Sequence, residues 1–204
     1  MLDLQSPQRA LPSVVLLVFG DTKGTPSGFG SGFLVQPDLV VTNYHVIQGH
    51  AVGLARVVTQ ENAYKVAVNA STDLALIRLE GLRGTALPLA SATSVEVGDE
   101  IYVAANPGGL VGTFSQGIVS AKREVEGRRL LQITALVAPG SSGGPVLNAD
   151  GKVVGVVVCS GEGLNFAVDV AEVRLLLEHV GPLQPLSSQP ALLDTAHCFA
   201  GGRD

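Results

Sequence analysis

The chain has 204 residues, of which 46% are hydrophobic and only 15% charged, and its formal net charge is −5. This composition supplies ample apolar material for a core, and the length suits one domain or two small fused barrels. The acidic balance argues against a nucleic-acid partner, because the basic cluster at residues 122–129 is interrupted by Glu124 and Glu126 and is expected to form a charged hairpin tip.

The N-terminal region predicts a polar, frayed segment over residues 1–12, followed by a first strand. The apolar run from Val14 to Phe19 is short for the core of a signal peptide, and no small-residue cleavage site follows it. No stretch approaches the roughly 20 apolar residues of a membrane span. The sequence as given therefore indicates a cytoplasmic protein, or an extracytoplasmic one if a leader was removed.

Short apolar runs then recur with turn residues between them, which is typical of an all-β fold. The first series covers residues 13–19, 30–35, 39–42, 51–59, 64–69 and 74–79. A looser segment, residues 81–98, is expected to link it to a second series at residues 100–105, 113–121, 129–136, 145–148, 153–160 and 164–168. We expect an N-terminal barrel over residues 1–90 and a C-terminal barrel over residues 91–181.

The spacing of apolar residues changes in the last regular element. From Asp169 the apolar residues fall at helical spacing, at Val170, Val173, Leu176, Leu177 and Val180. Asp169 and Glu172 are expected to form a capping pair at the start of this helix, and Gly181-Pro182 should end it. Residues 182–204 predict a flexible tail. Two cysteines, Cys159 and Cys198, do not suggest a disulfide framework.

The segment Gly140-Ser141-Ser142-Gly143-Gly144-Pro145 carries the strongest chemical signal. A serine flanked by glycines can present its hydroxyl to a substrate backbone that approaches closely. The backbone N–H groups of this turn, from Gly140 to Ser142, can together hold a developing oxyanion. A plain Ser/Gly turn between two strands is the alternative interpretation.

A serine nucleophile needs a base, and the base needs a third group that orients it. His45 follows an apolar strand that ends in the polar turn Thr42-Asn43-Tyr44. Asp73 enters an otherwise apolar strand, where an unpaired carboxylate is costly and an imidazole N–H is a suitable partner. Taken alone, His45 could equally be a core histidine as a catalytic base, and Asp73 could equally be a turn residue as its partner. Their combination with Ser142 favours a catalytic triad.

With these residues the chain resembles the trypsin-like serine proteases of the HtrA/Deg type. The resemblance rests on short segments in the family's order: residues 30–35, 42–46, 73–76, 106–110, 140–147 and 165–168. It implies two fused six-stranded antiparallel β-barrels of the chymotrypsin-like fold with a C-terminal helix. It also implies His45 as general base, Asp73 as orienting acid, Ser142 as nucleophile and an oxyanion hole at Gly140, Ser141 and Ser142.

The chain departs from the family pattern at three places. Ser141 stands where these proteases often have Asn and digestive ones Asp, which argues against zymogen control through an Asp at this position. Ala105 precedes Asn106, where the family usually has Gly. Residues 182–204 are too short for the peptide-binding PDZ domain of many HtrA proteins.

The resemblance also predicts the substrate cleft. Leu136 is expected at the floor of the main specificity pocket, with the strand through Val158, Cys159 and Ser160 pairing with the substrate backbone. Asn165 and Phe166 should line the far wall, although Phe166 also reads as core. None of these positions is acidic, so a basic substrate side chain would be buried without a partner. The pocket should therefore prefer small or medium apolar residues.

The favoured function is a serine endopeptidase that acts on unfolded or flexible polypeptides. Two rivals stay open: a protease-like module that holds peptides without cutting them, and an esterase or acyl transferase. The esterase elbow needs a strand-to-helix turn with acid and base after the serine, whereas here both precede it. No cofactor and no metal site is expected, because the histidines lack ligand spacing. A trimer and a monomer are both compatible with the sequence.

Overall fold

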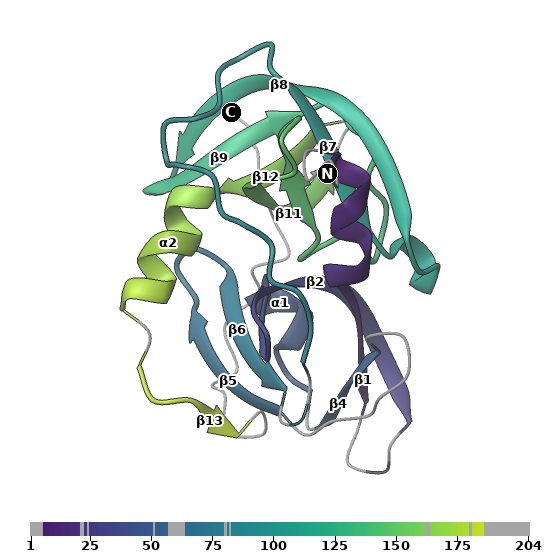
Figure 1. Cartoon of the computed structure of the whole chain (residues 1–204). Coiled ribbons are helices and arrows are strands. Elements are labelled where there is room, and N and C mark those ends of the chain that lie inside the picture. The colour runs from purple at the N-terminus through teal and green to yellow at the C-terminus, as the bar shows by residue number, and fades with distance from the viewer. Residues whose placement is uncertain are drawn as a thin grey trace, which may run out of the picture.

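The computed structural model describes residues 6–20, 23, 25–50, 52–56, 64–79, 81, 83–161, 164–179 and 181–185. The fold is mostly β, with one antiparallel sheet in the N-terminal half and one in the C-terminal half (Figure 1). A 3-10 helix, η1 (Pro7–Ser13), leads into the first strand and packs beside the C-terminal half. The all-β prediction is therefore confirmed at the level of class.

The N-terminal sheet contains seven strands in the order β13-β5-β6-β3-β2-β1-β4. Its members are β1 (Val14–Gly20), β2 (Pro26–Gln36), β3 (Leu39–Asn43), β4 (Val52–Arg56), β5 (Tyr64–Asn69), β6 (Leu74–Leu79) and β13 (Gln184–Pro185). The sheet is open among the described residues, whereas a closed six-stranded barrel was expected. The physical reason is that the outer edge of β5 pairs with β13 instead of β4.

The C-terminal half is a closed barrel of six antiparallel strands, as expected. Its members are β7 (Glu100–Ala105), β8 (Thr113–Val125), β9 (Arg128–Ile133), β10 (Pro145–Leu147), β11 (Val153–Gly161) and β12 (Leu164–Asp169). The predicted charged hairpin tip joins β8 to β9 through Glu126 and Gly127, both at positive φ. A 3-10 turn, η2 (Pro107–Gly109), follows β7.

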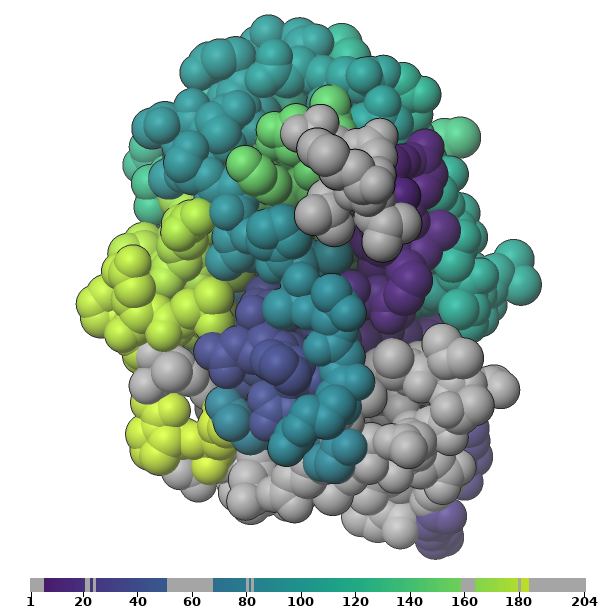
Figure 2. Space-filling view, viewed as in Figure 1, coloured from purple at the N-terminus to yellow at the C-terminus, as the bar shows by residue number. Residues whose placement is uncertain are grey.

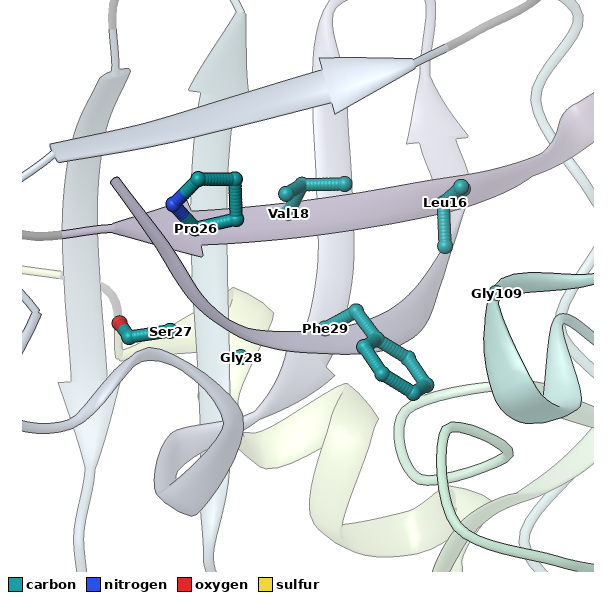
Figure 3. Close-up of a pocket in the computed structure, with 7 residues that line it drawn as sticks. All are labelled: Leu16, Val18, Pro26, Ser27, Gly28, Phe29 and Gly109. Carbon is teal, nitrogen blue, oxygen red and sulfur yellow. The ribbon is translucent and has the colours of Figure 1, made fainter. Parts of the chain in front are cut away.

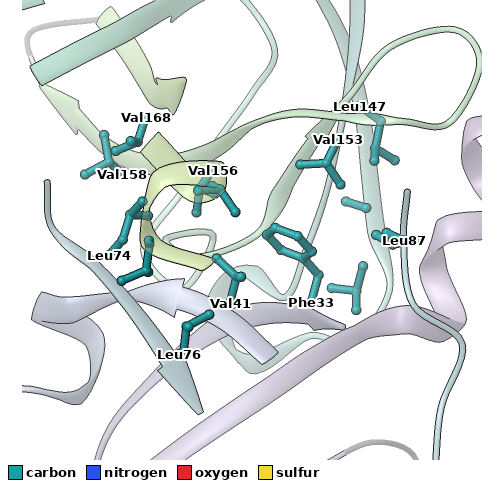
Figure 4. Close-up of a cluster of buried hydrophobic side chains, with 14 of the residues drawn as sticks. Phe33, Val41, Leu74, Leu76, Leu87, Leu147, Val153, Val156, Val158 and Val168 are labelled. Atoms are coloured by element: carbon teal, nitrogen blue, oxygen red, sulfur yellow. The ribbon is translucent and has the colours of Figure 1, made fainter. Parts of the chain in front are cut away.

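The two halves share a hydrophobic cluster between them and each has a cluster of its own, so the strands have nearly continuous apolar runs. Along β6, Ala75 and Ile77 face the interior of the N-terminal sheet, while Leu74 and Leu76 face the C-terminal barrel. In β11, Val156 and Val158 face the N-terminal sheet and Val157 the barrel interior. Alternate residues of a strand point to opposite faces, so both faces are buried. Figure 4 shows the side chains of the two halves meeting at this junction.

The last helix, α2 (Val170–Glu178), begins at Asp169, whose carboxylate accepts the backbone N–H of Ala171 at 2.8 Å. Glu172 does not complete a reciprocal cap, because its side chain pairs with Arg129 of β9 at 2.8 Å. Arg174 donates to the carbonyls of Leu89 and Ala90 and so ties the helix to the linker between the halves. Both the helix and the linker lie on the face shown in Figure 2.

Part of the predicted tail is ordered, since Gln184 and Pro185 pair with Val66 and Lys65. Residues 186–204, with Cys198, and residues 57–59 of the predicted fourth strand lie outside the described residues. Within the part of the chain that is described, no helix has the length and apolar character needed to cross a membrane.

Candidate active site

The pairing of two strands brings His45 and Asp73 together. In the register of β3 and β6, Asn43 lies opposite Leu74. His45 follows Asn43 in the one-turn helix α1 (Tyr44–Ile47), and Asp73 immediately precedes Leu74. The end of one strand and the start of its neighbour therefore place the two side chains at the same edge of the sheet.

Asp73 contacts His45 through both carboxylate oxygens. Oδ2 lies 2.6 Å from Nδ1 of the imidazole, and Oδ1 accepts the backbone N–H of His45 at 2.8 Å. Only 9% of the Asp73 side chain is exposed, against 36% for His45. A carboxylate beside Nδ1 favours the tautomer with the proton on that atom, which leaves Nε2 free to accept a proton.

Asp73 adopts a backbone conformation that is uncommon for a residue with a side chain. Its φ is +56°, in the left-handed region. The carbonyl of Asp73 is held by two donors, the backbone N–H of Tyr44 at 3.0 Å and Nδ2 of Asn43 at 3.1 Å. Such conformations cluster at functional sites, where the surroundings enforce them.

The predicted nucleophile lies in the loop between β9 and β10. Its carbonyl accepts the N–H of Ser31 at 2.8 Å, and the following Gly143 donates to the carbonyl of Val157 at 2.8 Å. The Ser142 hydroxyl donates to the carbonyl of Val158 at 3.3 Å. No hydrogen bond between Ser142 and His45 forms in the described part of the chain, although both line one cavity. Hydrogen bonds of this kind are often long or absent before substrate binds.

The peptide bonds around Gly140 leave two N–H groups for an oxyanion. The carbonyl of Pro139 accepts the N–H of Gly108 at 2.8 Å. Because a trans peptide directs its N–H opposite to its carbonyl, the N–H of Gly140 points away from Gly108. Neither this N–H nor that of Ser142 has an acceptor among the described residues. The N–H of Ser141 is not available, because it donates to the carbonyl of Ala138 at 2.8 Å.

Gly140 cannot carry a side chain here. Its φ is +95°, and an added Cβ would lie 2.7 Å from the Phe29 ring and 2.9 Å from the carbonyl oxygen of Asn106. The glycine thus allows both the turn and the close approach of the neighbouring loop.

A cavity of about 230 Å³ opens beside His45 and Ser142. Its other walls are apolar side chains and the backbone of the nucleophile loop: Val137, Ala138, Pro139, Ser141, Val157 and Val158. No acidic side chain lines it, so the cavity is suited to an uncharged, modest-sized group.

The predicted pocket residues are placed unevenly. Val158 lines the cavity, but Leu136 is 82% exposed and points to solvent, so it does not form the floor. This segment leaves β9 after Ile133. The residue that follows Leu136, Val137, lines the cavity instead. Asn165 supports this segment, because its Nδ2 donates to the carbonyl of Ala135 at 2.8 Å.

Phe166 is buried in the core between the halves and does not line the cavity. Cys159 and Ser160 lie in β11, where they pair with Phe166 and Asn165; their side chains lie outside the described part.

A second hollow has a volume of about 420 Å³, and none of the three predicted catalytic residues lines it. Its lining comes from β1, β2 and η2: Leu16, Val18, Pro26, Ser27, Gly28, Phe29 and Gly109 (Figure 3). The Phe29 ring contacts the Cα side of Gly140, so this hollow adjoins the nucleophile loop.

Sequence reasoning did not name Pro139 or Val157 as wall residues, and it assigned no role to Ser31. The signal for Ser31 was the small residues around it, Gly30 and Gly32, which allow another segment to approach. That signal is local and does not name the partner segment.

The comparisons place the chain among known proteases. The sequence model of the trypsin-like peptidase domain matches residues 30–156. The chain is 32% identical over 163 residues to a probable periplasmic serine endoprotease, DegP-like, of Chlamydia muridarum, an alignment that covers 74% of this chain and 32% of that protein. It is 34% identical over 182 residues to the magnetosome formation protease MamE of Paramagnetospirillum magneticum, covering 79% and 25%.

The solved structures agree. The active form of the Rv3671c protease of M. tuberculosis superposes with a TM-score of 0.79 at 26% identity, covering 87% of this chain and 84% of that one. Its inactive form gives a TM-score of 0.75 at 25% identity, covering 85% and 91%. The chain spans a third or less of the length of the curated relatives named above.

Proposed function

Because this chain belongs to the trypsin-like peptidase domain family, we propose that it is a serine endopeptidase of the HtrA type with Ser142 as its nucleophile. The observation that carries the proposal is the two-point contact of Asp73 with His45 at the mouth of the cavity that also holds Ser142. This contact sets up an oriented base beside a hydroxyl, which is what acyl transfer requires.

The reaction proceeds in two halves. The Ser142 hydroxyl turns from the Val158 carbonyl toward Nε2 of His45, gives up its proton and attacks the peptide carbonyl. The N–H groups of Gly140 and Ser142 bind the oxyanion that develops. His45 then protonates the departing amine, which leaves an acyl-enzyme. A water molecule, deprotonated by His45, hydrolyses the ester and restores Ser142.

The substrate is an unfolded or flexible polypeptide. The residue before the cut bond enters the cavity at Val137 and Val158, whose apolar walls favour small or medium aliphatic side chains. The segment after the cut bond runs past Gly140 into the hollow beside Phe29. The name of the chlamydial relative, a probable periplasmic protease, favours the extracytoplasmic alternative over the cytoplasmic location expected from the sequence.

One observation favours a second candidate, a module that holds peptides without cutting them: the Ser142 hydroxyl bonds to Val158 and not to His45. A fluorophosphonate probe separates the two, because only an activated serine is labelled. We expect labelling of the protein and loss of labelling in Ser142→Ala. Casein cleavage should be lost in parallel, with the melting temperature unchanged. A protein that resists the probe and leaves casein intact would overturn the endopeptidase proposal.

A further inference from the structure

Ser31 uses every polar atom it has, and its four hydrogen bonds reach three segments: the nucleophile loop, the end of β3 and the start of the η2 loop. It lies in β2 of the N-terminal sheet and is fully buried. Its N–H donates to the carbonyl of Ser142 at 2.8 Å, and its carbonyl accepts the hydroxyl of Thr42 at 2.7 Å. Its hydroxyl accepts the N–H of Asn106 at 2.8 Å and donates to the carbonyl of Gly140 at 2.8 Å.

The hydroxyl bonds of Ser31 fix the orientation of the loop around Gly140. The carbonyl of Gly140 belongs to the peptide that follows this glycine, and Ser31 holds it directly. The preceding peptide is held through the carbonyl of Pro139, which accepts the N–H of Gly108 in η2. The start of the η2 loop, at Asn106, is in turn tied to Ser31. Both peptides that flank Gly140 therefore depend on one hydroxyl.

This dependence matters because Gly140 has little steric resistance to rotation. A glycine at φ +95° can move to other conformations without the penalty that a side chain would impose. Rotation of the preceding peptide would turn the N–H of Gly140 away and bring the carbonyl of Pro139 toward the oxyanion position. Hydrogen bonds from outside the loop are what select one orientation.

The Ser31 hydroxyl performs both tasks at once. It must accept from Asn106 and donate to Gly140 at the same time, and a serine hydroxyl carries both a donor and acceptor lone pairs. An alanine at this position would remove the acceptor of the buried Asn106 N–H and the donor to the half-buried carbonyl of Gly140. The loop would then no longer be held in this orientation by the N-terminal sheet.

We propose that Ser31 is a positioning residue for the oxyanion hole: its hydroxyl locks the peptides on either side of Gly140 so that the Gly140 N–H faces the reacting carbonyl. The role rests on the proposed endopeptidase function. Ser31 does not touch the substrate. It acts from the N-terminal sheet on a loop of the C-terminal barrel, and so links the order of the oxyanion hole to the docking of the two halves.

The test compares Ser31→Ala with Ser13→Ala, which removes another buried serine of the N-terminal half. Active sites are first titrated with a fluorophosphonate, and kcat and KM are expressed per active site. Affinity is then measured for a peptide aldehyde, whose adduct with Ser142 carries an oxyanion. We expect Ser31→Ala to lower kcat by about 10- to 100-fold, near or below the loss of a complete oxyanion donor. Its KM should stay unchanged, and aldehyde affinity should fall in proportion to kcat/KM.

A merely structural role would give a different result. It would lower the melting temperature and the number of active sites, while kcat per site and aldehyde affinity matched those of Ser13→Ala and the wild type; that result would overturn the proposal. Should Ser31→Ala not fold, Ser31→Cys carries the test, because a thiol keeps the shape with a weaker donor and acceptor and should give an intermediate loss. A wild-type protein that is inert to the probe would instead overturn the endopeptidase function, and this role with it.

Discussion

The carboxylate of Asp73 binds both the ring and the backbone of His45. One oxygen lies 2.6 Å from the imidazole Nδ1, and the other accepts the His45 backbone N–H at 2.8 Å. The second bond fixes the carboxylate relative to the main chain, so the first bond fixes the ring. The imidazole can therefore present Nε2 to the cavity in one orientation, which a base in acyl transfer requires.

Replacing Asp73 by Asn tests this orientation. The amide cannot stabilise the imidazolium and favours the wrong tautomer, so kcat should fall by about 10⁴-fold. Peptide hydrolysis is measured alongside the melting temperature. Asp38→Asn is the control: Asp38 pairs with Arg78 at 3.4 Å and does not line the cavity, so this variant should retain full activity. Near wild-type turnover in Asp73→Asn would contradict the role of Asp73.

The activity should rise with pH and reach a plateau. His45 must be neutral to accept the Ser142 proton, so activity is lost at pH values where the imidazole is protonated. The measurement is kcat/KM on one peptide across pH 5 to 8, within the range where the protein stays folded. A rate that is highest at pH 5 and declines toward pH 8 would exclude His45 as the base.

Cleavage should follow small or medium aliphatic residues and avoid Lys and Arg, because the cavity has no acid to receive a cation. Val137→Asp should weaken aliphatic cleavage, since it puts a charge in the cavity wall. Leu136→Asp is the matched control: it introduces the same charge one residue away, on a side chain that is 82% exposed, and should leave the profile unchanged. Cleavage sites in a denatured proteome provide the measurement. A majority of cuts after basic residues in the wild type would show that the cavity is not the specificity pocket.

Gly143→Ala should be far more damaging than Gly127→Ala, although both glycines have positive φ. At Gly127 nothing lies within 4 Å of an added Cβ, so the cost is the conformational strain of about 1–2 kcal/mol. At Gly143 the Cβ would lie 2.0 Å from the carbonyl oxygen of Ser31 and 2.3 Å from the Thr42 hydroxyl. We expect a loss above about 4 kcal/mol or failure to fold. Urea unfolding gives the unfolding free energy of both variants. Equal losses of unfolding free energy would contradict the tight packing of the nucleophile loop.

His50 should make the protein less stable in mild acid. Burial lowers the pKa of His50, whose ring stacks on Phe19 with centroids 5.2 Å apart. The unfolded chain then binds more protons than the folded one just below the ordinary imidazole value of about 6.5, so stability falls as the pH drops through that window. Between pH 7 and pH 5, the wild type should lose more unfolding free energy than His50→Gln. A titration of His50 by NMR with a midpoint at or above the ordinary value would contradict this.

Much of this molecule could be predicted from local patterns. The all-β class follows from short apolar runs between turns, and the last helix from the change of period at Asp169. The Gly-rich stretch around Ser142 is recognisable because Gly140 and Gly143 need conformations and close approaches that other residues do not allow. The chemistry of a serine nucleophile and the family resemblance together predict His45 and Asp73 as its partners, and the structure brings these two side chains into contact.

The tertiary structure alone decided what depends on partners distant in the chain. The N-terminal sheet stays open because β13 pairs with the edge of β5, which joins residues near 185 to residues near 65. The exposure of Leu136 and the inward position of Val137 depend on where the segment leaves the barrel. The hydroxyl of Ser31 reaches a carbonyl 109 residues away. Residue type records what a position needs from its own backbone, whereas the identity of a hydrogen-bond partner across two sheets is set only when those sheets pack.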